Sequence, residues 1–198
     1  MTKTDTKKKH HHGNLKEALV LAGIELLEES GIDGLTLRKC AARAGVSHAA
    51  PAHHFDGLAG LKIAIAQEGF RIFSRYLEDG LTGLVDPQDR LRSICQGYLA
   101  FGLQHPGLLN VIFGTGLSAL VPDNQEGSYA YNILRGVCAP FVPEGQNPQI
   151  IEIQVWSLIH GFTLLYLAGE FGYPPPAIAD GPFEQVMTLL DRIGTLGN

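Results

Sequence analysis

The chain has 198 residues, of which 45% are hydrophobic and 18% are charged, and its formal net charge is −5. This is the composition of a globular protein that is long enough to bury a core, in one large domain or two small ones. No apolar run follows the basic N-terminal residues, so we expect no secretory signal and a cytoplasmic location.

The charge is distributed unevenly along the chain. Residues 1–62 carry nine Lys and Arg against seven Asp and Glu, whereas residues 63–198 carry six against thirteen. A weakly basic N-terminal part could meet a polyanion while an acidic remainder keeps the protein soluble. The excess of two positive charges is also compatible with chance, so charge alone does not assign a function.

The N-terminal residues 1–13 are polar and charged, and we expect them to form a flexible basic arm. Asn14, with Glu17 three residues later, has the pattern of a capping box that starts a helix. Apolar residues then recur at helical spacing, and Gly31 is placed to end this first helix.

Two short helices and a long one should follow. Thr36 is expected to cap a second helix, which Gly45 ends with a left-handed residue. Ser47 could cap a third helix, and Pro51 requires that helix to be short or partly 3₁₀ because proline removes a backbone donor. A longer helix is predicted over residues 58–81.

The remainder also has helical periodicity, and turn-forming residues separate its segments. The expected helices lie near residues 88–104, 106–120, 125–139, 149–171 and 183–196. No useful stretch alternates with the period of two that strands require. The sequence therefore predicts an all-α protein of about nine helices, with a three-helix head at 14–60 and a larger body at 61–198.

Residues 150–168 form the longest apolar stretch and are nearly long enough to cross a bilayer. The stretch contains Glu152, Gln154 and His160, which hydrocarbon would penalise. We therefore expect a fully buried helix of the body and no membrane partner.

The three cysteines are Cys40, Cys95 and Cys138, and no two of them have metal-ligand spacing. Buried, reduced thiols are the simplest interpretation, with a redox switch as the alternative. The histidines of residues 10–12 and 48–54 raise the question of a zinc site. No cysteine or carboxylate joins them at a known spacing, so we expect no metal and no cofactor. The Lys and His residues of the arm could instead track the phosphate backbone or minor groove of a nucleic acid, and a disordered arm without a role is the alternative.

The segment AGVS at 44–47 joins two short helices in the manner of a helix-turn-helix. The outer surface of the second helix is small, with Ala49, Ala50 and Ala52, so that helix could lie deep in a major groove. Ser47 and the neighbouring histidines could then reach bases or phosphates. The alternative from spacing alone is an ordinary helical hairpin within a core.

Residues 14–65 resemble the N-terminal DNA-binding domain of the TetR family of bacterial transcriptional repressors. The matching features are the first helix, Thr36-Leu37-Arg38, the turn Ala44-Gly45-Val46-Ser47, and His54-Phe55. The stretch Trp156-Ser157-Leu158-Ile159-His160-Gly161 resembles a loose form of the Trp-His-Gly triplet of one branch. The resemblance implies a ligand-responsive dimer that binds a palindromic operator.

The residues expected to contact DNA lie in the second and third helices and at the start of the fourth. They are Thr36, Arg38, Lys39, Ser47, His48, Ala49, Ala50, Ala52, His53, His54 and Lys62. The family usually has Tyr in place of Ala52 and Lys near Leu58, and both normally contact phosphates. These two departures put the affinity for the operator in doubt, and leave a ligand-binding protein with degenerate DNA binding as an alternative.

The body offers aromatic residues and histidines for a ligand pocket, near a helix break at His105-Pro106 and in the apolar stretch. The candidates are Tyr98, Phe101, His105, Phe113, Trp156 and His160. They suit a small, mostly apolar ligand bearing one polar or acidic group, although the same residues could simply form a core. The resemblance implies that the last two helices pair with those of a second subunit.

An enzyme and a structural helical protein are the rival classes. Residues 114–119, GTGLSA, match the dinucleotide-binding pattern but lack the strand-helix-strand context that this pattern needs. No hydrolase, metalloprotease or P-loop motif is present, so we expect no catalytic residues. A structural protein would not need a small-residue head with this turn.

Overall fold

The structure is a computed structural model that describes residues 15–114, 124–172 and 181–193. The described residues contain eight α-helices, short 3₁₀ segments and one π-helical segment, and no strand. The all-α prediction is therefore confirmed. The basic arm, the Asn14 cap and most of the GTGLSA segment lie outside the described residues.

The chain divides into two compact units, Met1–Ile65 and Ala66–Asn198, and the boundary falls within helix α3 (Gly57–Asp79). Each unit is built around its own buried apolar side chains. In the first unit these include Leu19, Leu27 and Leu61, none more than 2% exposed. Burial of such side chains is the main term that stabilises each unit.

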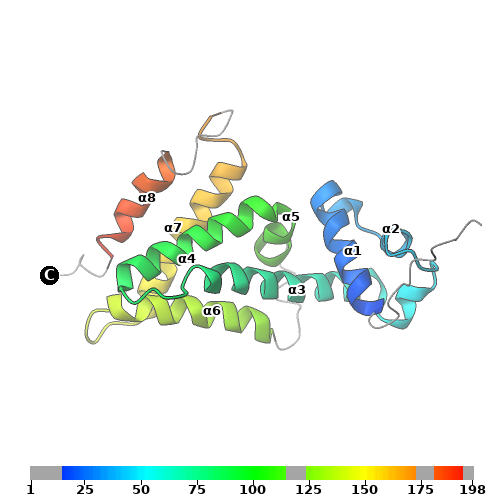
Figure 1. Ribbon diagram of the computed structural model, residues 1–198, viewed down its shortest axis with the longest axis horizontal. Coiled ribbons are helices and arrows are strands. Elements are labelled where there is room, and N and C mark those ends of the chain that lie inside the picture. The colour runs from blue at the N-terminus through cyan, green and yellow to red at the C-terminus, as the bar shows by residue number, and fades with distance from the viewer. Residues whose placement is uncertain (1–14, 115–123, 173–180, 194–198) are drawn as a thin grey trace, which may run out of the picture. The chain divides into compact units, whose positions relative to one another are not determined.

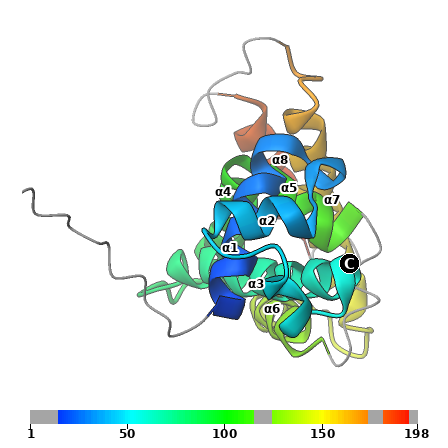
Figure 2. The same ribbon diagram turned by 90° about the vertical axis from the view of Figure 1, so that its right-hand side faces the viewer.

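The first unit contains α1 (Leu15–Ser30), α2 (Leu37–Arg43) and the first residues of α3, and α2 packs against α1 (Figures 1 and 2). The guanidinium of Arg43 on α2 forms a bidentate ion pair with Glu29 on α1, and its Nη1 lies 3.5 Å from Oε2 of Glu25. This fork-like pairing fixes α2 along α1.

The third short helix differs from its prediction. It is a 3₁₀ helix over Ala50–His53, and Ala49 is its N-cap without a side-chain hydrogen bond. Ser47 contributes its carbonyl, which accepts from the Ala50 amide at 3.0 Å, so its expected side-chain cap is wrong. Pro51 lies in the first turn and is buried, and the segment is 3₁₀ as the proline predicted.

The second unit contains the rest of α3 and five further helices. They are α4 (Pro87–Gln104), α5 (Pro106–Leu109), α6 (Gln125–Cys138), α7 (Gln149–Leu167) and α8 (Pro182–Leu190). Helix α4 packs against α6, α7 and α8 (Figure 1). Asp86 caps α4, since its carboxylate accepts from the Gln88 and Asp89 amides.

Gly97 allows α3 and α4 to approach closely. A Cβ atom at this position would lie 2.3 Å from the carbonyl oxygen of Tyr76 on α3, which is closer than any real contact. Farther along, α4 ends at the expected His105-Pro106 break, and a π-helical segment (Asn110–Gly114) follows α5. The break directs Phe113 back toward α4, where its ring stacks against Tyr98.

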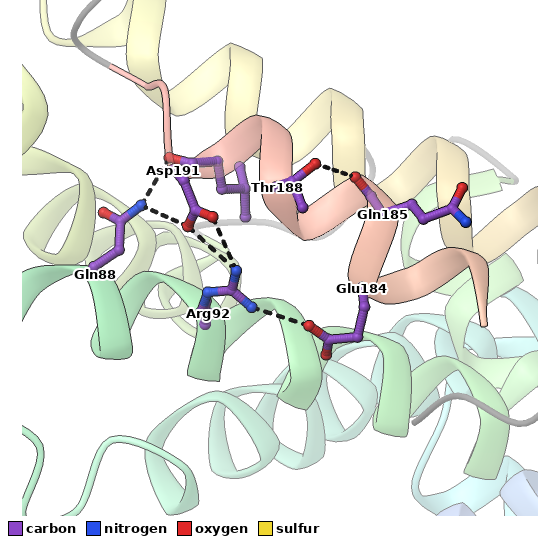
Figure 3. Close-up of polar contacts among 7 residues, drawn as sticks. Gln88, Arg92, Glu184, Gln185, Thr188 and Asp191 are labelled. Carbon is purple, nitrogen blue, oxygen red and sulfur yellow. Dashed lines mark hydrogen bonds and ion pairs between the residues drawn. The ribbon is translucent and has the colours of Figure 1, made fainter. Parts of the chain in front are cut away.

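Helix α8 is held to α4 by a polar cluster (Figure 3). The Arg92 guanidinium on α4 pairs with Asp191 at 3.1 Å and with Glu184 at 3.2 Å. The Gln88 side-chain amide donates to the Leu190 carbonyl at 2.9 Å and to Asp191 at 3.2 Å. These contacts lower the pKa of the Asp191 carboxyl and raise that of Arg92.

The prediction of a fully buried apolar helix is wrong for α7. Of the described helices, α7 is the one long and apolar enough to cross a membrane, and a third of its apolar window is buried. Its inner face includes Val155 and Ile159, whereas Ile153 and Leu164 on the outer face are 59% and 45% exposed. The described residues therefore leave this apolar face of α7 uncovered. All three cysteines are free and buried, as predicted.

Candidate nucleic-acid interface and ligand cavity

The turn after α2 begins at Gly45, whose φ of 69° requires the left-handed region. The Val46 amide donates to the Ala41 carbonyl at 3.0 Å, and the Gly45 amide donates to the Ala42 carbonyl at 3.2 Å. This is the Schellman arrangement that ends a helix at a glycine. The chain reverses direction within a few residues of this turn, and the 3₁₀ helix begins at Ala50.

The surface that follows this turn is small and polar. Most of the residues expected to contact DNA are exposed, namely Thr36, Arg38, Lys39, Ser47, His48, Ala49, Ala52, His53 and His54. Ala50 and Lys62 are of intermediate exposure. Phe55 is buried in the first unit. These exposed residues therefore form a surface of small alanine side chains and imidazoles, which a nucleic acid could approach closely.

Two of the expected DNA contacts also have local structural roles. The Thr36 hydroxyl accepts from the Lys39 amide at 3.2 Å and caps α2. The Lys39 ammonium donates to the Gly34 carbonyl at 3.0 Å. Lys39 would have to share or release this bond to contact a phosphate, whereas the guanidinium of Arg38 forms no hydrogen bond or ion pair among those found in the described residues.

The second unit contains a partly open cavity of about 470 Å³ between α3, α4, α6, α7 and the segment after α5. Apolar and aromatic side chains dominate its walls. The lining residues are Phe70, Phe73, Leu77, Ile94, Cys95, Tyr98, Ile112, Phe113, Asn124, Gly127, Ser128, Ala130, Tyr131, Leu134, Val155, Trp156 and Ile159. This size lies within the range of about 300–1,000 Å³ that is usual for small-molecule pockets.

Three of the six residues expected to bind a ligand line this cavity, namely Tyr98, Phe113 and Trp156. His160 lies behind the wall, with its Nδ1 2.6 Å from the Tyr98 hydroxyl. Phe101 and His105 lie outside the lining. Phe101 is completely buried against Phe73, and Nε2 of His105 lies 3.4 Å from the Tyr76 hydroxyl.

Burial perturbs the polar groups of this wall. Burial raises the pKa of the Tyr98 hydroxyl, and interaction with the Trp156 indole opposes this effect. Burial lowers the pKa of the His160 imidazole. Each shift favours the neutral form of its group, so the Tyr98–His160 pair is uncharged at neutral pH.

Glu152 lies beside the hydroxyl of Tyr131 and is 1% exposed. The Tyr131 hydroxyl donates a short hydrogen bond to the carboxylate, and Nε of Arg135 approaches it at 3.3 Å. The hydrogen bond to Glu152 is the main reason that the pKa of Tyr131 is raised. The guanidinium of Arg135 also lies over the Tyr131 ring, 5.1 Å from its centroid.

Each of the two units matches a known protein family. Residues 19–65 match the family model "Bacterial regulatory proteins, tetR family". Residues 91–190, which are half of the chain, match "Tetracyclin repressor-like, C-terminal domain". The chain belongs to the TetR family. It is therefore a transcriptional regulator with a helix-turn-helix, in a family whose members bind DNA and ligands and form dimers.

This TetR-family chain is similar to three proteins at low sequence identity. A Mycobacterium tuberculosis protein described as an uncharacterized HTH-type transcriptional regulator is 24% identical over 78% of this chain and 71% of its own. A solved structure of a Rhodococcus sp. RHA1 protein of unknown function has a TM-score of 0.77 at 25% identity, covering 96% of this chain and 98% of its own. FadR of Bacillus subtilis, solved with stearoyl-CoA, has a TM-score of 0.69 at 17% identity, covering 88% and 96%.

Several residues that line the cavity of this TetR-family body were not predicted from the sequence. Phe70, Phe73 and Leu77 lie on α3 at the spacing of one helix face, and Tyr131 and Leu134 lie on α6. The spacing of the α3 residues could have marked an inward face. It could not distinguish a cavity wall from a packed core, because both present the same apolar stripe.

Proposed function

We propose that this TetR-family regulator is a ligand-responsive repressor that binds a palindromic operator as a cytoplasmic homodimer. In this proposal residues 1–13 are a basic arm, residues 14–60 bind DNA, and residues 61–198 bind the ligand and form the dimer. The supporting observation is the exposed alanine and histidine surface after the Gly45 turn, in the segment that matches the tetR model. The rival function is ligand binding with degenerate DNA binding.

The proposed DNA contacts are those expected from the sequence, with the 3₁₀ helix Ala50–His53 entering the major groove. The alanine side chains allow close approach, and Ser47 and His48 are exposed beside them. If imidazoles contact phosphates, binding should tighten as the pH falls toward 6, because an anion favours the charged form.

The proposed ligand site is the cavity of the second unit, with Tyr98, Phe113 and Trp156 in its wall. The apolar walls favour a mostly apolar ligand. The complex of Bacillus subtilis FadR with stearoyl-CoA supports a ligand with a large apolar part in a protein of this fold. We also assign the chain to the branch with a Trp-His-Gly-type C-terminal domain, on the basis of Trp156 and His160-Gly161.

The proposed dimer surface is the outer face of α7 with α8. Its exposed apolar side chains are Ile150, Ile153, Leu164, Leu165, Leu167 and Leu189. An apolar face of this kind favours burial against a second copy. Light scattering should report a dimer for the native chain and a monomer for Ile153→Glu. The control is Val85→Glu, because Val85 is 90% exposed outside α7 and α8.

The decisive experiment is a fluorescence anisotropy titration with duplex from upstream of the gene, at two salt concentrations. A specific site should bind about 10³-fold or more tightly than an unrelated duplex, and binding should weaken steeply with salt. Ala49→Glu should abolish specific binding, because it adds a negative charge at the proposed groove surface, whereas Val85→Glu should leave it unchanged. Equal, weak binding to every duplex in a selection from random sequences would favour the rival function.

A further inference from the structure

The described lining of the cavity contains no Lys, Arg, Asp, Glu or His side chain. The polar residues of this lining are uncharged, and they include Tyr98, Ser128, Tyr131 and Asn124. An ionised group moved from water into such surroundings is strongly penalised unless an opposite charge pairs with it. Among the described residues, this lining offers hydrogen-bonding groups but no counter-ion.

A buried negative charge lies next to a lining residue. The Glu152 carboxylate accepts a hydrogen bond from the hydroxyl of Tyr131, so its field at the cavity opposes a second anion. Arg135 does not reverse this effect, because its Nε is directed at Glu152 and its side chain is 53% exposed. Tyr131 and Arg135 already occupy the carboxylate, which leaves it a poor partner for a ligand cation.

Tyr98 provides a neutral hydrogen-bonding site in the lining. The Tyr98 hydroxyl is 2.6 Å from Nδ1 of His160, and the ring of Tyr98 is stacked with Phe113 and lies edge-on to Phe73. One hydroxyl oxygen can donate one hydrogen bond and accept two. Tyr98 can therefore keep its contacts with His160 and the Trp156 indole and still accept one hydrogen bond from a ligand hydroxyl.

We propose that this cavity selects uncharged ligands, namely apolar molecules with one hydroxyl group that bonds to Tyr98, over carboxylates of the same carbon skeleton. This inference rests on the proposed function, in which the cavity is the effector site. It narrows the ligand class, since the sequence allowed either a polar or an acidic group.

The chain has one tryptophan, and Trp156 lines the cavity, so its fluorescence reports occupancy directly. Three probes share a ten-carbon chain and differ in charge at pH 7.5: 1-decanol, decanoate and decylammonium. We expect decanol to change the Trp156 emission with an affinity at least tenfold higher than that of either ion. Calorimetry on the full chain gives the same comparison without an optical probe.

Two substitutions test the origin of the selection. Glu152→Gln keeps the shape of the side chain but removes the buried charge, and should raise the affinity for decanoate severalfold while changing that for decanol little. Tyr98→Phe should lower the affinity for decanol severalfold. The matched control is Tyr129→Phe, which removes a hydroxyl from an exposed residue outside the lining and should change neither affinity.

Decanoate or decylammonium binding as tightly as decanol would overturn the proposal. It would also be overturned if no probe bound, or if Glu152→Gln left the affinity for decanoate unchanged. Glu152→Gln provides this test even if Tyr98→Phe does not fold. The operator titration requires no ligand, so failure of the proposed DNA-binding function would be recognised separately from failure of this ligand selection.

Discussion

The Tyr98 hydroxyl lies 2.6 Å from Nδ1 of His160, and this contact joins α4 to α7 at the wall of the cavity. The two residues are 62 positions apart in the sequence. The contact therefore depends on the packing of the whole second unit. Protonation of His160 should lower the stability of this unit.

The stability of the protein should fall between pH 7.5 and 5.5. Burial lowers the pKa of His160 below its unfolded value, so the unfolded chain binds a proton first as the pH falls through about 6.5. The stabilisation is complete above that pH and is lost below it. Thermal unfolding should show a lower Tm at pH 5.5, on a scale of about 2–4 °C per kcal/mol. His160→Gln should weaken the dependence of Tm on pH. An unchanged dependence would contradict the assignment of this effect to His160.

Removal of the Arg92 guanidinium should release α8 from α4. Arg92→Ala breaks the ion pairs with Asp191 and Glu184, and we expect a loss of about 1 kcal/mol, since partly exposed pairs contribute little individually. Hydrogen exchange should increase selectively in α8. Arg75→Ala is the control, because Arg75 is 53% exposed and its distance to Glu68 is 3.8 Å. Equal effects of the two substitutions would show that the cluster has no special role.

Gly45 and Gly136 should respond to alanine in opposite directions. Gly45 has a φ of 69°, and a Cβ there costs about 1–2 kcal/mol in the left-handed region. Gly136 lies inside α6, and apart from its chain neighbours and the nearby backbone of its own helix no atom lies within 4 Å of an added Cβ, so Gly136→Ala should stabilise the protein by about 1 kcal/mol. Denaturant unfolding measures both changes. Destabilisation by Gly136→Ala would mean that the added methyl group is not tolerated in α6.

The sequence predicted the helices more accurately than the cavity. Caps and turn glycines such as Thr36 and Gly45 act locally, so their positions can be read from neighbouring residues. The cavity wall combines residues from four helices, and no local pattern encodes which of them meet. His105 illustrates the limit, because it was expected at the pocket from its position at a helix break and instead lies beside Tyr76.

The double variant Ala52→Tyr with Leu58→Lys should strengthen DNA binding. It restores the two residue types that the family usually has, at positions that are exposed and half-buried respectively. One added phosphate contact by lysine should steepen the dependence of log K on log salt by about 0.9. Anisotropy at several salt concentrations measures this slope. Val85→Lys, the control, adds the same charge in the second unit and should leave the slope unchanged; an equal change in both would indicate a non-specific effect of charge.

The burial of Cys40, Cys95 and Cys138 has a practical consequence for spectroscopy. Burial raises the pKa of each thiol, to about 12 for Cys138, so the reactive thiolate is scarce at neutral pH. Maleimide dyes and nitroxide spin labels should therefore react slowly with the native chain. A single cysteine introduced at the exposed Val85 or Ala49 could be labelled selectively without removing any native cysteine.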